Sequence, residues 1–454
     1  MSYLNKNIHK IHFIGIGGVS MSALAEIMKQ RGYEVSGSDI RESKITQHLK
    51  SQNIDTIIGH KRQNVNGKDL IIYTGAVKSD NVELIEAKKL GIPAVERAPF
   101  LGEIIKGYNC PIAISGTHGK TTTTSVLAEI FLEGKKNPTV LVGGCLPGSN
   151  SNYVIGSKDY IIFEACEYLN SFLNFPSKIA IVLNIEKDHL DFFSGIEEIK
   201  ESFTKFVNLT GSDGIAIFNG DDQNCLDVAK NYIGKSIFIS TKNKDCDYYA
   251  EIKNKVGFPV FDVYEFGKYL GEIKLIIPGN HNVYNALCAI AAARHAGIAH
   301  DIIACSLQNF KGAGRRFEYV GVKKGITVVD DYAHHPSEIK ATLTAAANLK
   351  FDKIICIFQP HTYTRTKALL DDFAKSLSLC DTCILVDIYA AREKNTCGIS
   401  SKDLAEKITN GIYAESFEKA VELATQNATP NTLILTMGAG DVYKMGPMIL
   451  NKIE

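Results

Sequence analysis

The segment from Cys110 to Gly134 constrains the fold more than any other part of this sequence. It reads CPIAIS, then GTHGKT, then TTTSVLAEIFLEG, which is an apolar run, a Gly-rich turn and a helical stretch. A strand that passes across glycines directly into a helix is typical of a βαβ unit in a parallel sheet. The sequence therefore predicts an α/β domain with a ligand site at the carboxyl end of this strand.

The Gly-rich turn has the chemistry of a phosphate-binding loop. Gly116 and Gly119 allow the backbone to approach phosphate oxygens, Lys120 can reach terminal phosphates, and Thr121 offers a hydroxyl to Mg²⁺. A Walker A loop has a further Gly where this chain has Ile114, which argues against a motor ATPase or a GTPase. The alternative is a chance Gly-Lys-Thr in a surface turn, but the strand before it and the helix after it favour nucleotide binding.

Composition bounds the class of protein. The 454 residues predict about three domains, and Lys plus Arg equal Asp plus Glu at 50 each, so no net positive charge attracts nucleic acid. No window reaches the roughly 20 apolar residues of a membrane span, so we expect no membrane partner. The 11 cysteines indicate a reduced, cytoplasmic protein, and Cys380 and Cys383 lack the further ligands of a zinc site and are interpreted as thiols at a helix-strand junction.

Apolar runs alternate with helical stretches along the whole chain, which predicts three α/β domains. The first covers residues 1–108 and contains IHFIGIGG, EVSGSD and LIIYTGA as strands. A new strand at Cys110 opens a central domain of residues 109–311, and Gly- and Lys-rich composition near Lys311 precedes a third domain of residues 312–454. We expect a Rossmann-like N-terminal domain, a central ATPase-type domain with the phosphate loop, and a Rossmann-like C-terminal domain.

Acidic and polar residues at predicted strand ends are candidate metal ligands. Glu164 ends the run YIIFE, Glu167 follows three residues later, and His189 comes shortly after KIAIVLNI. Taken singly, each is more often a solvated acid or a packed histidine. Since a phosphate loop precedes them and phosphoryl transfer needs a metal, they become candidate Mg²⁺ ligands.

A second glycine loop, GIGGVS from Gly15 to Ser20, nearly fits G-x-G-x-x-G and is followed by Asp39 about 20 residues on. Alone, this pattern indicates a nicotinamide cofactor. A nucleoside diphosphate group at the same helix N-terminus needs the same glycines and the same dipole. A dehydrogenase has no need of the separate phosphate loop about 100 residues later, which favours the second interpretation.

Eight blocks in a fixed order cover nearly the whole chain: HFIGIGGVSMSALAEI, GYEVSGSD, SGTHGKTTTT, NIEKDHLDFF, GNHNVYNA, FKGAGRRFE, DDYAHHPSEI and FQPHTYTRT. In these blocks the sequence resembles the Mur ligases, ATP-dependent amide ligases of peptidoglycan precursor synthesis, and most of all their alanine-adding branch. The shortened phosphate loop is the usual form in that branch. The resemblance assigns the first glycine loop to a UDP-sugar.

The resemblance implies a reaction and its partners. ATP is expected to phosphorylate the lactyl carboxylate of UDP-N-acetylmuramate, and the amine of L-alanine to displace phosphate from the resulting acyl phosphate, with two Mg²⁺ ions. We expect a monomer or a weak homodimer. The nearest rival is a sister ligase that attaches a ready-made tripeptide, although the first loop GIGGVSMS is similar to the alanine-adding branch. A nicotinamide-dependent oxidoreductase is the more distant rival.

The resemblance also implies site residues. Lys120 would bind the γ-phosphate, Thr121 and Glu164 one Mg²⁺, and His189 a second. The expected ATP-binding set is Gly116, Thr117, His118, Gly119, Lys120, Thr121, Thr122, Asn282, Asn285, Arg316 and Asp331. The expected UDP-sugar set is Gly17, Gly18, Val19 and Ser20 on the diphosphate with Asp39, Thr74 and Gly75 near the uridine.

For the amino acid, the resemblance implies a pocket formed by Tyr332, His334, His335, His361 and Arg365. Relatives often have an Arg directly after the His of QPH, where this chain has Thr362. Arg365 is then the expected carboxylate clamp, since a guanidinium binds carboxylates in a bidentate manner. His334, His335 and His361 are all candidates to accept the proton from the alanine ammonium, and the catalytic set is Lys120, His189, Arg316 and His334.

Overall fold

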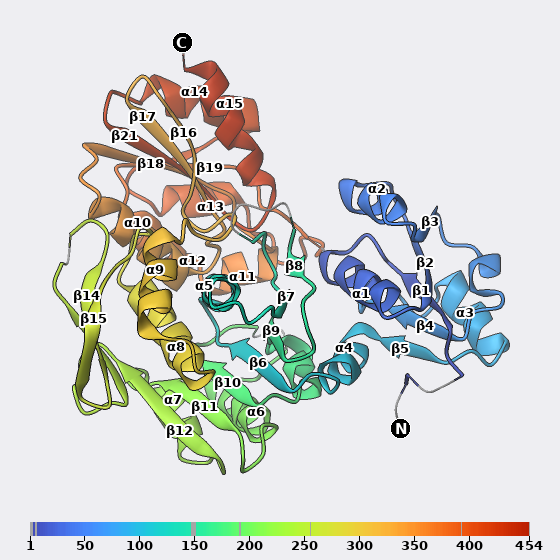
Figure 1. Ribbon diagram of the computed structural model, residues 1–454. Helices are drawn as coiled ribbons and strands as arrows, with labels where there is room; N and C mark the ends of the chain where they lie inside the picture. The colour runs from blue at the N-terminus through green and yellow to red at the C-terminus, as the bar shows by residue number, and fades with distance from the viewer. Residues whose placement is uncertain are drawn as a thin grey trace. The chain divides into compact units, whose positions relative to one another are not determined.

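The structure is a computed structural model, which describes residues 3–4, 7–146, 151–189, 192–254, 256–391 and 393–453. Its contacts divide the chain into two compact units. The first contains Met1–Asp247 and Cys288–Ile302, and the second contains Tyr248–Leu287 and Ile303–Glu454. Each unit combines helices with largely parallel sheets, so the α/β class predicted from the sequence is confirmed (Figure 1).

The first unit begins with a parallel five-stranded sheet in the order β3-β2-β1-β4-β5. Its strands are β1 (Lys10–Ile14), β2 (Glu34–Asp39), β3 (Asp55–Ile58), β4 (Leu70–Tyr73) and β5 (Ala94–Glu96). The accompanying helices are α1 (Val19–Gln30), α2 (Lys44–Ser51), η1 (Arg62–Val65), α3 (Val82–Lys89) and α4 (Arg97–Ile105), with α1 to the left of the strands and α3 to the right in Figure 1. Strand order reverses at β1, which is where open parallel sheets bind ligands.

A second sheet of the first unit has the order β12-β11-β10-β6-β9-β7-β8, and only the β7–β8 pair is antiparallel. Its strands are β6 (Cys110–Ser115), β7 (Thr139–Leu141), β8 (Tyr153–Val154), β9 (Tyr160–Glu164), β10 (Ile179–Val182), β11 (Ile215–Asn219) and β12 (Lys235–Ser240). Its helices are α5 (Lys120–Glu133), η2 (Tyr168–Asn174), α6 (Ile196–Asn208) and α7 (Gln223–Ala229). The central strand β10 consists of four buried apolar residues, as expected for a strand covered on both faces.

The second unit contains a six-stranded sheet in the order β16-β17-β21-β18-β19-β20, parallel except between β16 and β17. The strands are β16 (Glu318–Lys323), β17 (Ile326–Asp331), β18 (Lys353–Phe358), β19 (Thr382–Leu385), β20 (Gly411–Tyr413) and β21 (Thr432–Met437). The helices that follow them are α10 (Pro336–Ala347), α11 (Tyr363–Ala368), α12 (Leu370–Leu377), α13 (Ser401–Glu406), α14 (Phe417–Gln426), η3 (Asp441–Lys444) and α15 (Met445–Lys452).

The second unit also contains an antiparallel arm that the sequence patterns did not reveal. It consists of β13 (Tyr248–Ile252), β14 (Val260–Glu265) and β15 (Lys268–Lys274). The chain then enters α8 (His281–His295) and α9 (His300–Asn309), each of which has residues in both units. The stretch TKALLDDFAKSLSL, whose pattern predicts one helical segment, is divided between α11 and α12 at Leu369.

Local sequence explains several helix starts. Ser43 and Ser400 accept backbone N–H groups at the starts of α2 and α13, and each forms a reciprocal capping box with the third helical residue. Helix α10 begins with Pro336, which has no N–H that would need a partner. These signals can be read from the sequence because they depend on residues only a few positions apart.

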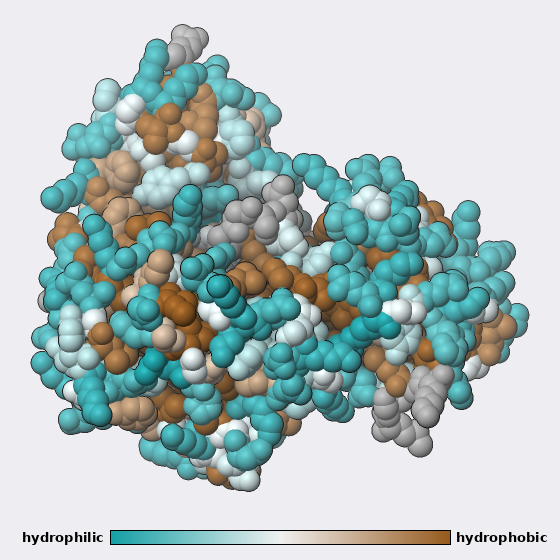
Figure 2. Space-filling view, viewed as in Figure 1, coloured by the Kyte–Doolittle hydropathy of each residue, from teal (hydrophilic) through white to brown (hydrophobic). Residues whose placement is uncertain are grey.

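Burial separates the core from the surface. Hydrophilic residues cover most of the first sheet's domain on the face shown in Figure 2, and hydrophobic residues appear there only as scattered patches.

Within the part of the chain that the structure describes, no helix combines the length and the apolar character needed to cross a membrane. All eleven cysteines are free thiols, and Cys380 and Cys383 lie at the junction of α12 and β19, as predicted.

Candidate functional site

The phosphate loop joins β6 to α5 in the first unit, in the strand-loop-helix order that the sequence predicts. Gly116 has φ 140° and Gly119, the N-cap of α5, has φ 85°. A Cβ atom on Gly116 would lie 3.0 Å from Cβ of Leu183 and 3.2 Å from the backbone N of Asn184. The loop therefore needs glycine both for its backbone conformation and for its close approach to the segment after β10.

Lys120 extends across this loop to a buried carboxylate. Its ammonium donates to the carbonyl oxygens of Gly116 and Thr117, the latter at 3.1 Å, and lies 3.2 Å from Oε2 of Glu167. Burial alone would lower the pKa of Lys120, but the negative charges of Glu167 and, further away, Glu164 outweigh it and raise this pKa above its ordinary value. Lys120 is therefore a fixed positive charge at the N-terminus of α5.

Three oxygen-bearing side chains near Lys120 have the chemistry of a Mg²⁺ site. Thr121 is buried at the start of α5, Glu164 ends β9, and Glu167 is buried three residues later. Oε1 of Glu164 accepts the backbone N–H of Gly143 at 2.6 Å. Carboxylate and hydroxyl oxygens are the hard ligands that Mg²⁺ prefers, so these residues fit the ion that phosphoryl transfer requires.

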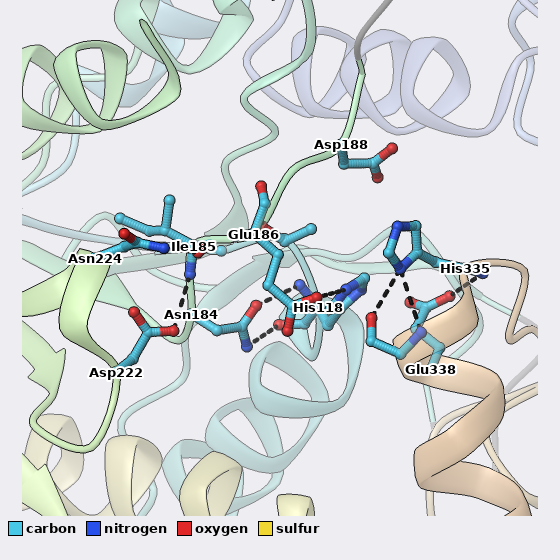
Figure 3. A network of polar contacts seen from close by, with 12 residues as sticks. His118, Asn184, Ile185, Glu186, Asp188, Asp222, Asn224, His335 and Glu338 are labelled. Carbon is cyan, nitrogen blue, oxygen red and sulfur yellow. Dashed lines mark hydrogen bonds and ion pairs between the residues drawn. The ribbon is translucent and has the colours of Figure 1, made fainter. Parts of the chain in front are cut away.

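The loop is also held by the segment after β10, a feature that sequence reasoning missed. Asn184 Oδ1 accepts the backbone N–H of His118 at 2.8 Å, and its Nδ2 donates to the His118 carbonyl at 3.1 Å (Figure 3). The backbone N–H of Glu186 donates to Oγ1 of Thr117 at 2.9 Å, and its carboxylate lies 3.4 Å from Nε2 of His118. The backbone of His118 and the side chain of Thr117 are thus fixed from outside the loop.

His189, the proposed ligand of a second metal, lies in the same unit beyond these contacts. Its backbone has φ 52°, an unusual conformation for a residue other than glycine. Its ring lies 4.6 Å from the ring of Tyr168, centroid to centroid, and its Nε2 is 3.8 Å from Oδ2 of Asp188. Leu169 and Asn170, which follow Tyr168, also have φ 54°, so uncommon backbone conformations cluster here, as they do at functional sites.

The first glycine loop lies at the carboxyl edge of the five-stranded sheet. Gly15 has φ 81°, and a Cβ atom there would lie 2.9 Å from Cγ2 of Thr74. Oδ2 of Asp39 accepts the backbone N–H of Gly17 at 2.9 Å, and a Cβ atom on Gly17 would lie 2.8 Å from that oxygen. Asp39 therefore anchors the glycine loop, and a side chain at position 17 would displace its carboxylate. Gly75 follows Thr74 directly after β4.

Helix α1 begins directly after this loop with an N-terminus of the kind that binds anions. Its N-cap is Gly18, which provides no side-chain hydrogen bond, and Val19 is 41% exposed at the first helical position. Ser20 follows as the second helical residue. Backbone N–H groups at such a helix start, together with the helix dipole, favour a phosphate or diphosphate group. The residues predicted to bind the UDP-sugar thus lie together in the first unit.

Arg315 and Arg316 of the second unit differ in their contacts. The guanidinium of Arg315 donates to Oδ2 of Asp330 at 2.8 Å and to the carbonyl of Gly438 at 2.7 Å, and it lies 4.9 Å from the ring centroid of Tyr332. The guanidinium of Arg316 lies 5.1 Å from that centroid, with its Nη1 4.0 Å from Glu338. Arg315 thus has a structural role, whereas the guanidinium of Arg316, the proposed phosphate contact, has only these longer contacts among the residues that the structure describes.

Asp331, at the end of β17, organises the segment that contains Arg316. Its two oxygens accept the backbone N–H groups of Phe317 and Ala333, each at 2.8 Å. Burial raises the pKa of Asp331 to about 6, although the charge of Arg316 and the two hydrogen bonds act in the opposite direction. The carboxylate of Asp331 thus links Phe317, which follows Arg316, to Ala333, which follows β17.

The two adjacent histidines before α10 have different environments, and Figure 3 shows one of them, His335, beside Glu338. His335 is the N-cap of α10, where its ring Nδ1 lies 2.8 Å from Oγ of Ser337. Glu338 completes the capping box and accepts the backbone N–H of His334 at 3.0 Å. The ring of His334 also lies near Glu338, with Nδ1 3.2 Å from Oε2. His335 therefore has a structural part in starting α10.

His361 follows β18 within a row of aromatic rings in the second unit. Its ring lies 5.8 Å from that of His334 and 5.7 Å from that of Tyr389, and His334 lies 5.3 Å from Tyr332. Burial lowers the pKa of His361 to about 4, helped by the nearby charges of His334 and Arg365. The structure therefore brings together Tyr332, His334 and His361, and sequence reasoning missed Tyr389.

The amide pair of α8 lies at the start of that helix. Asn282 and Asn285 are both buried, and Nδ2 of Asn285 donates to Oδ1 of Asn282 at 3.0 Å. Nδ2 of Asn282 donates to the carbonyl of Pro278 at 2.7 Å. Their amides are thus paired with each other and with the loop before α8.

Three domain families match the chain in order. They are described as "Mur ligase family, catalytic domain" at residues 10–109, "Mur ligase middle domain" at 114–293 and "Mur ligase, glutamate ligase domain" at 315–440. The UDP-N-acetylmuramate–L-alanine ligase of Clostridium acetobutylicum is 49% identical over 98% of both chains. That of Acetivibrio thermocellus is 50% identical over 99% of this chain and 97% of its own.

Solved structures agree with the sequence comparison. The UDP-N-acetylmuramate–alanine ligase of Thermotoga maritima superimposes with a TM-score of 0.81 at 29% identity, and the match covers 98% of both chains. A murein peptide ligase of Psychrobacter arcticus gives a TM-score of 0.70 at 25% identity with the same coverage. The fold is therefore that of a three-domain ligase.

Proposed function

The chain belongs to the Mur ligase family, and on this basis we propose that it joins L-alanine to UDP-N-acetylmuramate while ATP is split into ADP and phosphate. Relatives of this name match it along nearly its full length. The observation in the structure that best supports the proposal is the phosphate loop, in which Lys120 contacts Glu167 at the N-terminus of α5. Such a loop serves phosphoryl transfer, and in this family the γ-phosphoryl group of ATP is transferred to a carboxylate of the substrate.

In the proposed reaction an oxygen of the substrate carboxylate attacks the γ-phosphorus of ATP, and ADP leaves. The alanine amine then attacks the carbonyl carbon of the acyl phosphate, phosphate leaves with the bridging oxygen, and the nitrogen loses a proton. Lys120 and Arg316 are proposed to stabilise the charge of the transferring group, since fixed positive charge beside that group contributes most to catalysis in such sites. Mg²⁺, held by Thr121, Glu164 and Glu167, would neutralise phosphate charge, and we propose a second ion at His189.

The contacts in the second unit narrow the choice of proton acceptor. His335 caps α10, and the pKa of His361 is lowered to about 4, which makes that ring a weak base at neutral pH. We therefore propose His334, whose ring lies beside Glu338, as the acceptor. Tyr332, His335, His361 and Arg365 are proposed to surround the alanine, with Arg365 on its carboxylate.

The remaining site assignments are also proposals. The first glycine loop, from Gly17 to Ser20, would bind the diphosphate at the start of α1, with Asp39, Thr74 and Gly75 beside the uridine. Gly116 to Thr122, together with Asn282, Asn285 and Asp331, would bind ATP. We propose domain boundaries at residues 1–108, 109–311 and 312–454, a cytoplasmic location consistent with eleven free thiols, and a monomer or weak homodimer.

The test is phosphate release from ATP by the purified chain with Mg²⁺ and UDP-N-acetylmuramate. The proposal predicts release that depends on L-alanine and is absent without the UDP-sugar. Release with the tripeptide L-alanyl-γ-D-glutamyl-meso-diaminopimelate, but not with alanine, would instead favour a peptide ligase. If neither amine stimulates release, the chain is not an amide ligase of this kind.

A further inference from the structure

Three buried cysteines lie together in the second unit, where the proposed function gives them no role. Cys356 is in β18 and Cys383 is in β19, and the two are direct partners across these parallel strands. Neighbouring strands are about 4.8 Å apart, so the two side chains stand side by side on one face of the sheet. Cys380, three residues before Cys383, lies in the turn between α12 and β19.

All three side chains lie in the same part of the core. Cys356 and Cys383 are fully buried, and Cys380 is nearly so. They pack in one apolar cluster with Phe373 of α12, whereas Ile357, the strand neighbour of Cys356, packs in a different cluster. Successive strand residues point to opposite faces of a sheet. The three thiols therefore share the apolar layer between the sheet and α12.

The thiols form hydrogen bonds with one another. Sγ of Cys380 accepts from the thiols of Cys356 and Cys383, and Cys356 also forms a hydrogen bond with Cys383. Sγ of Cys380 lies 3.1 Å from the carbonyl oxygen of Leu377, the last residue of α12, and 3.4 Å from that of Thr382. Three sulfurs and two carbonyl oxygens thus converge from β18, from β19 with the turn before it, and from the end of α12.

This set of atoms favours a soft divalent cation. Thiolate sulfur selects ions such as Zn²⁺ over Mg²⁺ and Ca²⁺, which prefer oxygen ligands. Three thiolates around a divalent ion leave a single negative charge, and the carbonyl of Leu377 can supply the fourth ligand of a tetrahedron. That carbonyl belongs to the C-terminal end of α12, where the helix dipole attracts a cation. Binding would draw the sulfurs to about 3.8 Å from one another, because Zn–S bonds are about 2.3 Å long.

We propose that Cys356, Cys380 and Cys383 form a structural site for a thiophilic divalent ion, of which Zn²⁺ is the type. On binding, each thiol releases its proton to solvent, and three metal–sulfur bonds form without any change of oxidation state. The ion would tie β18 to β19, whose following segments carry His361 and Tyr389 with ring centroids 5.7 Å apart. The site would exist whether or not the chain is a ligase. Thiols that served only as small apolar side chains would bind no ion.

Cadmium tests the site on the full-length chain, since Cd²⁺ replaces Zn²⁺ and its bonds to thiolates absorb ultraviolet light. The exposed thiols Cys145 and Cys305 are first alkylated, and excess Mg²⁺ is present to occupy sites built from oxygen ligands. We expect one Cd²⁺ per chain, with ultraviolet absorption from thiolate bonds and a cadmium NMR signal typical of three sulfur ligands.

Two variants each remove one ligand with a side chain that suits an apolar core. Cys356→Val and Cys380→Ala should each bind Cd²⁺ at least about a hundredfold more weakly, since even an outer partner of a metal ligand contributes up to that factor. The matched control is Cys288→Ala, which removes a buried thiol of α8 in the first unit and should bind Cd²⁺ as the wild type does. Far-ultraviolet circular dichroism checks that each variant is folded.

A second measurement guards against slow entry of Cd²⁺ into the folded core. The metal content of the chain purified from zinc-supplemented medium should be one Zn²⁺ in the wild type and none in Cys356→Val. A wild type that holds neither Zn²⁺ as purified nor Cd²⁺ after titration would overturn the site, as would equal loss of the ion in Cys288→Ala. A chain lighter by the mass of two hydrogen atoms, which reduction restores, would show a disulfide among these thiols and would also overturn it.

Discussion

Replacing Lys120 with Met separates the two tasks of this lysine. The pair with Glu167 is nearly buried, since the two side chains are 15% and 3% exposed. Without the ammonium, Glu167 remains as a buried carboxylate that lacks this partner, and removing one member of such a pair costs about 3 kcal/mol. The double variant Lys120→Met/Glu167→Gln also removes the unpaired negative charge of Glu167 and should recover about 2 kcal/mol of the lost free energy of unfolding. Stability should therefore return in the double variant, but catalysis should not.

Turnover should fall about a thousandfold in both variants, because the positive charge on the transferring phosphoryl group is missing in each. Unfolding in urea is best followed by far-ultraviolet circular dichroism, since the chain has no tryptophan. Lys136→Met, which removes a lysine 6.0 Å from the ring of Tyr160 beyond the other end of α5, is the control and should change stability by less than about 1 kcal/mol. Equal free energies of unfolding for the single and double variants, or normal ligation by Lys120→Met, would show that Lys120 does not have these two tasks.

Three further perturbations have defined outcomes. As pH falls through about 6, Asp331 gains a proton and can no longer accept the backbone N–H groups of both Phe317 and Ala333. We therefore expect kcat/KM for ATP to fall below pH 6. A value of kcat/KM that stays constant down to pH 5 would contradict this. Gly17→Ala places a methyl 2.8 Å from Oδ2 of Asp39 and should raise KM for the UDP-sugar at least about tenfold with little change in KM for ATP, as initial rates will show. A chelator should abolish phosphate release and excess Mg²⁺ should restore it, whereas activity that survives chelation would exclude the proposed metal.

The parts of the fold that could be predicted are those that local sequence specifies. The loop from Gly116 to Thr121 was recognisable because its glycines, its lysine and its flanking strand and helix are contiguous. Asp39 was found because it follows the first glycine loop by about 20 residues, and Glu164 because it ends an apolar run. Both are the last residues of strands in the structure. The three-domain α/β class followed from the same alternation of strands and helices.

The contacts that sequence reasoning missed join residues far apart in the chain. Asn184 holds His118 from 66 positions away, and although Asn184 opens the block NIEKDHLDFF, the block itself does not indicate this contact. Glu167 was noted as a strand-end acid, but its pairing with Lys120 depends on the neighbouring positions of β6 and β9 in the sheet. Glu83 lies in α3, whose charged sequence predicts a solvent-exposed helix. Its side chain is nevertheless buried, because Ser38 and Asn64, from distant parts of the chain, donate hydrogen bonds to its carboxylate.

The antiparallel arm was missed for a different reason. Residues from Tyr248 to Lys274 mix charged and aromatic residues, and many side chains of β14 and β15 are only partly buried. Their pattern is therefore weaker than the continuous apolar runs of the parallel strands, such as Ile179–Val182. The composition also does not change between the arm and Gly279 before α8, so it does not mark the end of the arm.

The most direct test of ligation through an acyl phosphate follows an oxygen atom. UDP-N-acetylmuramate is labelled with a heavy oxygen isotope at both oxygens of its carboxylate and turned over with ATP and L-alanine, and the products are weighed by mass spectrometry. An acyl-phosphate route predicts one labelled oxygen in the released phosphate and one in the new amide. Unlabelled phosphate, or a UDP-sugar that gains no alanine while ATP is consumed, would rule that route out.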